Sequence, residues 1–367
     1  MLLHAAGAAG QGFLGRLLRP ETGFARAVMY GDAVQLLRQA PWLGQGGDTW
    51  RHAFRSLQST PYVGSEVHSG YLDLALDIGL PGLALVLLWL ALQGVQLIRR
   101  RSAMLPSYVA ILLHSAIDFD MSYGLIWLLL LWMAADAVRP GRFMISRKRP
   151  LRPAICLLAA VCLVLLGLSG LRQATSLKLY QQALSRYAAP STEERRFEAA
   201  SKLLRRALEL APYRNQARIA LASRSNTTEK VSLLRQGLSY EPADARLWLA
   251  LGRALAESNH AGTVPALRQA VALDRFDHKG QTMVLQEVLQ LAQRLREQGQ
   301  MQEALEVADA GLALYEEYAE QAEMMRLTLA RNDRQFNLTG EAEEWGKKLQ
   351  EISNSFSWND HDQQVRR

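Results

Sequence analysis

The sequence predicts an all-α protein with two parts, a group of membrane-spanning helices followed by a solenoid of stacked helical repeats. Three observations support this prediction. Long apolar runs are confined to residues 80–171, and such runs cross a bilayer as helices. Basic residues gather in two short clusters between these runs. Beyond residue 190, amphipathic helical segments recur every 30 to 33 residues, a period typical of solenoids.

The apolar region is predicted to contain four membrane spans, at residues 80–98, 105–117, 121–138 and 154–171. The first is nineteen residues long, which is about the length needed to cross the hydrocarbon core. The basic clusters are Arg99-Arg100-Arg101 and the segment 139–152, which carries six basic residues. Because basic loops stay in the cytoplasm, residues 1–79, the turn 118–120 and everything after 172 are predicted to lie outside. The expected location is therefore the cell membrane, multi-pass, with extracytoplasmic repeats.

The net charge of +7 does not indicate nucleic-acid binding, because of its distribution. Residues 175–367 contain 26 basic and 26 acidic residues, so the excess lies in the first half of the chain. There, 9 of 16 basic residues belong to the two clusters between apolar runs. This distribution is typical of cytoplasmic anchor loops, and we expect no nucleic-acid partner.

The first 79 residues are predicted to be an extracytoplasmic loop with short helices at 24–40, 48–57 and 65–78. The N-terminus lacks the basic start and the uninterrupted apolar run of a signal peptide. Export of this loop therefore requires earlier spans, and we expect that further spans precede this sequence, which is either truncated or begins at a late start codon.

Three segments of the C-terminal half align as repeats: AASKLLRRALELAPYR, EKVSLLRQGLSYEPAD and TVPALRQAVALDRFDH. Small residues occupy the equivalent packing positions Ala207, Gly237 and Ala270. The pattern resembles tetratricopeptide repeats, in which stacked helix pairs build one continuous core. We therefore expect an extracytoplasmic loop at 1–79, spans within 80–172, repeats at 173–353 and a disordered tail at 354–367.

The loop before the first span carries the residues best suited to chemistry. His68 lies there, and an imidazole is suited to take a proton near neutral pH, although a lone histidine in a loop is more often a polar surface residue. Arg51 and Arg55 lie one helical turn apart and are candidates to bind a phosphate group. Gly44, Gly46 and Gly47 form either an anion-binding nest or, as we favour, a sharp turn. Four aromatic residues either stack on sugars or sit in the interfacial belt: Trp42, Trp50, Tyr62 and Tyr71.

Ionisable residues also lie at the outer end of a predicted span, in the segment HSAIDFD. His114 lies one helical turn before Asp118, and Asp120 follows. Such residues either handle the acceptor or are solvated at the interface, and both alternatives stay open. No set of His, Cys, Asp and Glu has the spacing of metal ligands, so we expect neither a metal nor another cofactor.

These segments together resemble the O-antigen ligase and polymerase family. The resemblance rests on Pro41-x-x-Gly44-x-Gly46, the segment HSGYL from His68, the helix start DIGLPG, and HSAIDFD, and it covers residues 26–171. It implies a GT-C-like membrane fold and transfer of a glycan from an undecaprenyl-diphosphate carrier to an acceptor hydroxyl. His68 matches the family's catalytic histidine and Arg26 its diphosphate-binding arginine. A second such arginine of the family lies in a loop that this sequence does not include.

Two other functions remain in view. A membrane-tethered repeat scaffold without catalysis, or an inactive truncated relative, would use the repeats to hold a protein or a glycan partner. A transporter fragment is disfavoured, because the loops are short and the spans carry no charge network. In each case membrane lipid surrounds the spans.

Overall fold

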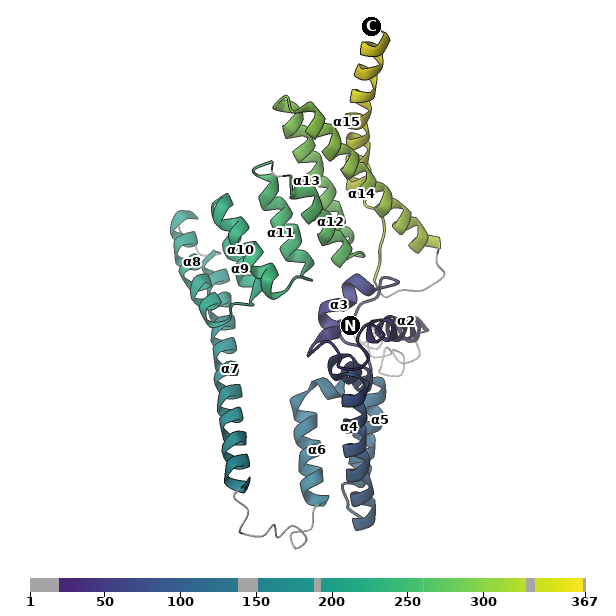
Figure 1. The fold of residues 1–367 in the computed structure, drawn as a ribbon, viewed down its shortest axis with the longest axis vertical. Helices are drawn as coiled ribbons and strands as arrows, with labels where there is room; N and C mark the ends of the chain where they lie inside the picture. The colour runs from purple at the N-terminus through teal and green to yellow at the C-terminus, as the bar shows by residue number, and fades with distance from the viewer. Residues whose placement is uncertain (1–19, 138–150, 188–192, 260, 328–333, 366–367) are drawn as a thin grey trace, which may run out of the picture. The chain divides into compact units, whose positions relative to one another are not determined.

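The computed structural model describes residues 20–137, 151–187, 193–259, 261–327 and 334–365. Within these ranges the chain is helical and has no β-strand, which confirms the predicted all-α class. The chain divides into two compact units; Figure 1 shows the N-terminal segment of the first in purple to blue and most of the second in teal to yellow. The first comprises Met1–Arg147 with Met324–Asn337, and the second comprises Lys148–Glu323 with Leu338–Arg367.

The first unit begins with helices α2 (Pro20–Leu37) and α3 (Thr49–Leu57). Helix α2 starts four residues before the predicted position, with a proline as its first residue, where the fixed φ of proline suits a helix start. The two helices share an apolar core whose fully buried members include Met29, Leu36 and Trp50. This small core gives the loop region a fixed structure of its own.

Helix α4 (Gly70–Arg100) is kinked at Gly79, whose φ of 73° lies in the left-handed region. It begins five residues later than predicted, because the Ser69 hydroxyl caps it by accepting a bond from the N–H of Leu72 at 3.4 Å. Beyond the kink, Leu80 N–H donates to the Pro41 carbonyl oxygen at 2.8 Å. The predicted boundary at residue 79 therefore coincides with a kink inside one helix.

Helices α5 (Leu105–Ile117) and α6 (Gly124–Ala137) pack against α4, and the short 3-10 helix η1 (Asp120–Ser122) joins them. Helix α5 has the bounds predicted from the sequence. The buried core of this bundle contains Leu90, Leu97, Tyr108 and Leu130. Large apolar side chains on the other faces are exposed, among them Leu85, Leu88, Leu113, Leu128 and Leu131.

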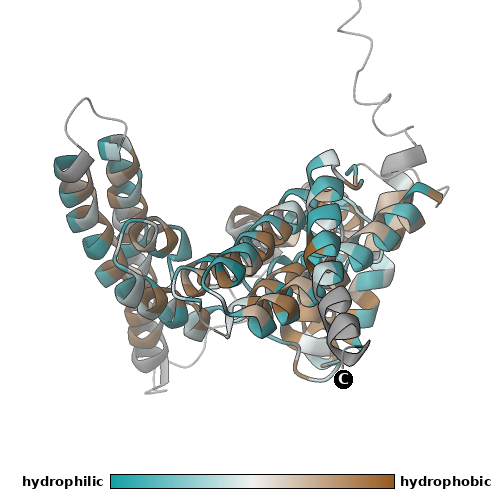
Figure 2. Cartoon of the chain, turned by 90° about the horizontal axis from the view of Figure 1, so that it is seen from above, coloured by the Kyte–Doolittle hydropathy of each residue, from teal (hydrophilic) through white to brown (hydrophobic). Residues whose placement is uncertain are grey.

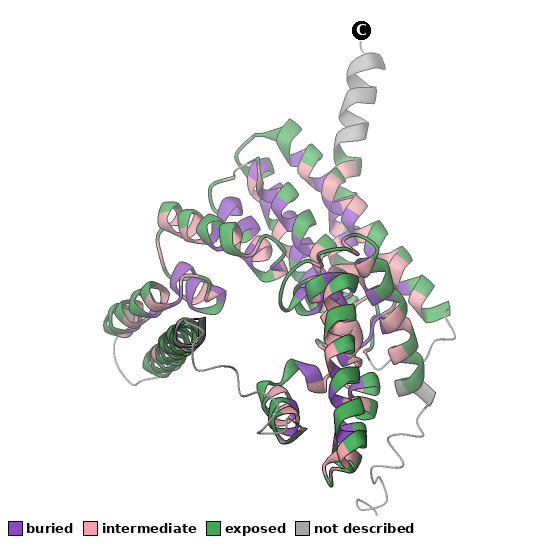
Figure 3. Ribbon diagram, turned by 60° about the horizontal axis from the view of Figure 1, so that its bottom comes forward, coloured by how far each residue is buried: buried purple, intermediate pink, exposed green. Residues whose placement is uncertain are grey.

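Two helical segments in the described chain are long and apolar enough to cross a membrane, Gly70–Arg100 and Ala160–Tyr187. Leu105–Ile117 and Gly124–Ala135 are apolar but shorter. The second segment belongs to α7 (Leu151–Tyr187), one continuous helix that joins the span predicted at 154–171 to the first residues of the predicted repeat region. No proline or glycine interrupts α7 after Gly170, so the boundary predicted at residue 172 falls within it. Figure 3 shows how little of this helix is buried.

The second unit continues with helices stacked in chain order: α8 (Glu193–Leu210), α9 (Asn215–Ala222), α10 (Thr227–Tyr240), α11 (Ala245–Ala256), α12 (Thr263–Leu273) and α13 (His278–Glu297). Each contacts the next, and α11 also contacts α9 and α13. The odd-numbered helices α9, α11 and α13 therefore form one layer, with α8, α10 and α12 as the other. Figure 2 shows that these helices carry both apolar and polar faces.

The core of the repeats follows the predicted period. Leu204, Leu234 and Leu267, spaced like the aligned segments, are each at most 1% exposed. The small residues predicted at packing points are buried, and a Cβ at Gly237 would lie 3.0 Å from the side chain of Leu247. The repeat alignment therefore gave the correct helical register.

Helices α14 (Met301–Leu327) and α15 (Gly340–Val365) end the chain. Glycines allow these helices to approach closely, since a Cβ at Gly311 would lie 3.0 Å from Leu349. Helix α15 extends to Val365 and so runs through most of the segment 354–367 for which a disordered tail is predicted. Once the packed part of α15 is formed, adding further turns costs little, and no glycine or proline stops it.

Candidate functional site

The loop between α3 and α4 holds His68 against the connection from α5 to α6. The N–H of Gly70 donates to the carbonyl oxygen of Asp118 at 2.9 Å, which fixes the start of α4 on that connection. The hydroxyl of Tyr30, on α2, donates to the carbonyl oxygen of His68. The histidine backbone is thus held from two sides by elements far apart in the sequence.

His68 and Asp118 form a side-chain pair across these segments. Nδ1 of His68 lies 3.2 Å from Oδ1 of Asp118, and the ring of Phe119 meets the imidazole edge-on at a centroid distance of 5.4 Å. About a quarter of the His68 side chain stays accessible. Its other ring nitrogen, Nε2, has no hydrogen-bond partner among the residues that the structure describes. A carboxylate on Nδ1 favours the tautomer in which Nε2 accepts a proton.

The environment of Asp118 favours its ionised form. Burial raises the pKa of this carboxyl, but hydrogen bonds from the N–H of Phe119 and from His68, with the charges of His68 and His114, hold the pKa below its usual range. The bond from Phe119 N–H is 2.9 Å long. Asp118 is therefore suited to orient and stabilise a positively charged imidazolium rather than to take up a proton itself.

Arg26 reaches the same region from α2, one helical turn before Tyr30. Its Nη1 lies 3.4 Å from the carbonyl oxygen of Ile117, the residue before Asp118. Its Nε is buried and has no acceptor in the described part of the chain. The pKa of the Tyr30 hydroxyl is raised, mainly by burial. The Arg26 guanidinium lowers this pKa and the Asp118 carboxylate raises it, so these three groups influence one another electrostatically.

A second histidine–carboxylate pair lies beside the first. Nδ1 of His114 lies 2.6 Å from Oδ2 of Asp120, which is also 3.5 Å from the hydroxyl of Ser115. The His114 side chain is 58% exposed. The sequence placed His114 one turn from Asp118, whereas the structure pairs it with Asp120.

Arg51 and Arg55 have contacts of their own. Arg51 binds Glu66 through Nε at 2.7 Å and lies 3.4 Å from Asp48, so its charge is already balanced. The Arg55 guanidinium lies over the ring of Phe54, 5.7 Å from its centroid. The phosphate-binding role predicted for these two arginines stays a prediction, and the structure gives it no geometric support.

The glycine-rich turn after Pro41 packs on α4 just before the kink. Gly44 and Gly46 both have positive φ, and the amides of Gln45 and Gly46 donate to the carbonyl oxygens of Leu76 and Asp77. Because these amides already have acceptors, the turn serves to reverse the chain closely against α4 rather than to bind an anion.

The four aromatic residues singled out from the sequence have different surroundings. Trp50 and Tyr62 are at most 1% exposed and belong to the core of α2 and α3, so neither of the roles predicted for them applies. Tyr71 donates its hydroxyl to the carbonyl oxygen of Leu112 at 2.9 Å. Trp42 alone of the four is strongly exposed, at 73%.

Sequence reasoning missed Tyr30 and Phe119, which contact His68. The one available signal for Tyr30 was its spacing of four residues from Arg26, which puts both on the same helix face. Nothing in the sequence indicated Phe119. Among the described residues, no group of three or more His, Cys, Asp and Glu could hold a metal ion.

No family model and no curated protein matches the chain. Two crystal structures of MamA are similar to part of this chain. One has 14% identity and a TM-score of 0.30, and the match covers 50% of this chain and 94% of that protein. The other has 15% identity and a TM-score of 0.26, covering 45% and 92%. Likenesses this weak carry no argument about function. The structure itself shows a chain that is helical in its described parts, with a repeat solenoid and a histidine–aspartate pair.

Proposed function

We propose that the chain acts in membrane glycosyl transfer of the kind performed by O-antigen ligases and polymerases. One observation carries the proposal. His68 and Asp118, each singled out by a different motif and fifty residues apart, lie within hydrogen-bonding distance, and Arg26 contacts the adjacent backbone. An imidazole oriented by a carboxylate is a general base, and a nearby guanidinium suits an anionic leaving group.

In the proposed reaction, Nε2 of His68 accepts the proton of an acceptor hydroxyl as its oxygen attacks the anomeric carbon of the lipid-linked glycan. The bond from that carbon to the diphosphate oxygen breaks, and the diphosphate leaves with the electron pair. Arg26, whose buried Nε has no acceptor among the described residues, is the group proposed to receive the developing charge. Asp118 stabilises the imidazolium that results.

The same proposal requires the first unit to sit in a membrane. Large apolar side chains cover the outer faces of α4 and α6, and lipid would remove them from water. Trp42 and Leu43 are 73% and 85% exposed. The close approach of Gly79 to the Trp42 carbonyl fixes them beside the start of the proposed span at Leu80. Aromatic and apolar residues at this level favour the membrane interface.

The test replaces His68 by alanine in the full-length gene and measures transfer of lipid-linked glycan in membrane vesicles. We expect a loss of at least about 100-fold, the usual contribution of a general base. His52→Ala is the matched control, because His52 is an exposed histidine of the same loop region, on α3. Transfer at the parental rate by His68→Ala would refute the proposed chemistry.

The scaffold alternative is favoured by the separate core of the second unit. It predicts that deletion of residues 191–367 abolishes surface-polysaccharide assembly while His68→Ala leaves it intact. The membrane orientation is tested by a reporter inserted after Gly64. Activity of a cytoplasmic reporter at this site would place His68 on the wrong side for the lipid-linked substrate.

A further inference from the structure

The face of the second unit formed by α7, α9 and α11 carries two adjoining cavities. One, of about 310 Å³, lies between the end of α7, the start of α8 and α9. The other, of about 420 Å³, lies between α7, α9 and α11. Both are lined by Ala220 of α9 and by Ser223, the residue that follows this helix, so the two cavities adjoin and make up one groove. We call it the arginine groove, after Arg196, Arg224, Arg246 and Arg253, which line it.

The groove is cationic. The described residues that line the two cavities include these four arginines and no aspartate or glutamate. Arg246 and Arg253 each bind a carboxylate outside the lining, Asp244 and Glu287, yet their side chains remain 58% and 57% exposed. A guanidinium has five N–H donors, so these pairings leave donors for a further acceptor.

Arg196 adds a donor within the wall. Its Nη1 donates to the carbonyl oxygen of Tyr187 at 3.2 Å, while its Nε is buried and has no acceptor among the described residues. Arginine pairs with carboxylates through parallel N–H bonds, which gives both strength and geometric selectivity. A ligand with carboxylate groups therefore fits this wall better than a neutral one.

The rest of the described lining is mostly apolar or aromatic, with Leu184, Ile219 and Leu249 between the arginines and Tyr180 and Tyr187 beside them; Gln216 and Ser223 are its other polar members. A glycan would place most of its hydroxyl groups against the apolar side chains, and the described lining side chains offer few acceptors for hydroxyl hydrogens. A peptide with apolar side chains between acidic ones satisfies both kinds of surface.

We propose that the arginine groove binds an extended segment of a partner protein in which acidic residues alternate with apolar ones. Packed helices lie about 8–10 Å apart, so crossing from α7 to α11 spans roughly 20 Å. An extended chain covers this with about six residues at 3.3 Å each. The proposal rests on the second unit alone and is independent of the glycosyl-transfer chemistry of the first.

The experiment measures fluorescence anisotropy of a labelled eight-residue peptide of alternating glutamate and leucine, titrated with the full chain in detergent micelles. The same peptide with lysine in place of glutamate tests the charge requirement. An oligogalacturonate of similar length tests the competing glycan ligand. We expect the acidic peptide to bind at least about tenfold more tightly than either, and its binding to weaken as salt rises.

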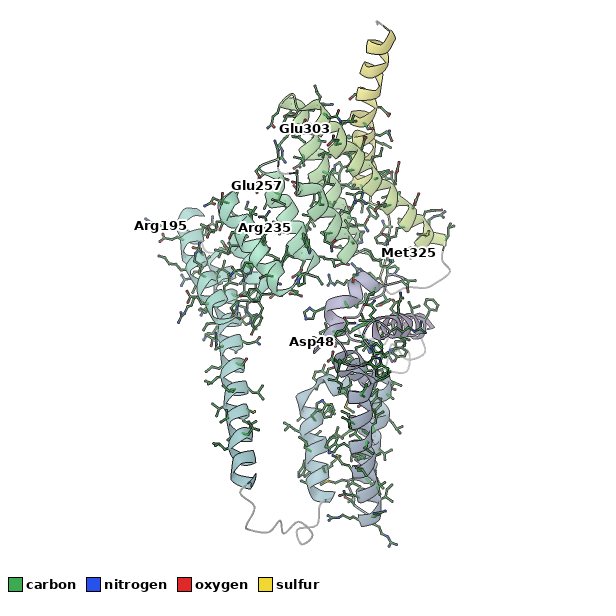
Figure 4. All side chains as sticks on the ribbon, in the orientation of Figure 1. Asp48, Arg195, Arg235, Glu257, Glu303 and Met325 are labelled. Atoms are coloured by element: carbon green, nitrogen blue, oxygen red, sulfur yellow. The ribbon has the colours of Figure 1, made fainter. Side chains whose placement is uncertain are left out.

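Two variants locate the site: Arg224→Gln and Arg253→Gln each remove one exposed groove charge, and each is expected to weaken binding by about fivefold. Arg195→Gln is the matched control, because Arg195 is exposed at the outer edge of the solenoid on α8 and does not line the groove (Figure 4). Thermal unfolding shows whether each variant remains folded. Equal weakening by Arg195→Gln, equal binding of the lysine peptide, or tighter binding of the oligogalacturonate would overturn the proposal.

Discussion

Replacing Gly70 by alanine tests whether the contact between the start of α4 and Met121 holds the His68–Asp118 pair in place. A Cβ on Gly70 would lie 2.6 Å from Cγ and 2.8 Å from Cβ of Met121, and 3.3 Å from its backbone nitrogen. Carbon atoms in ordinary contact are about 3.5–4.0 Å apart, so the overlap is roughly 1 Å. Met121 is only 4% exposed, which limits its freedom to move aside.

The expected cost follows from two opposed effects. Overpacking a filled core costs about 1–3 kcal/mol, whereas exchanging glycine for alanine in a helix gains up to about 1 kcal/mol. The net destabilisation is therefore about 1–2 kcal/mol, which lowers the melting temperature by several degrees. Gly124→Ala is the matched control, because Gly124 also begins a helix but has nothing within 4 Å of an added Cβ.

The assay is thermal unfolding of the purified full chain in detergent, followed by circular dichroism. Gly70→Ala should unfold at a lower temperature than Gly124→Ala. Met121→Ala should cost less in the Gly70→Ala background than in the parent, since it removes Cγ, the nearer of the two overlapping side-chain atoms. If the two glycine variants are equally stable, or if Met121→Ala is equally harmful in both backgrounds, the packing argument is refuted.

Three further predictions concern other parts of the chain. Tyr62→Phe should destabilise by about 1–3 kcal/mol in denaturant titration, because it removes the bond of 2.9 Å from the buried Tyr62 hydroxyl to Asp32. Asp118→Asn should flatten the acid dependence of the melting temperature below about pH 4. The pKa of Asp118 is lowered in the fold, so its ionised form stabilises above the unfolded pKa, and this contribution is lost as pH falls through the folded value. Gly252→Ala should lower the melting temperature of the repeats, since the added Cβ would lie 2.5 Å from a methyl group of Leu267.

Much of the secondary structure could be predicted from local patterns. The bounds of α5 follow from its apolar run, and the register of the repeats follows from the spacing of small and apolar positions. The differences lie at helix ends that no breaking residue marks. Helix α15 continues through the segment predicted as a tail, and α7 continues from the predicted span past residue 172, because a helix continues wherever nothing breaks it.

The site shows the same division between sequence and structure. His68 and Asp118 could be selected from the sequence, because ionisable residues beside apolar runs are unusual. Arg26 was selected only through the resemblance to the ligase and polymerase family. The residues with which the candidate side chains pair could not be predicted from the sequence. The pairing of His114 with Asp120, and the balancing of Arg51 by Glu66, depend on how α3 and α5 turn and pack, which no local spacing specifies.

By itself the sequence determined that the chain is helical and where its apolar and repeat segments lie, and it indicated which ionisable groups are candidates for chemistry, because these features depend on local composition and period. Only the tertiary structure decided which of those groups meet. Gly70 lets α4 approach Met121, and this close packing brings an imidazole and a carboxylate fifty residues apart to within 3.2 Å. Contacts between segments so distant depend on the packing of whole elements, and single residues do not encode them.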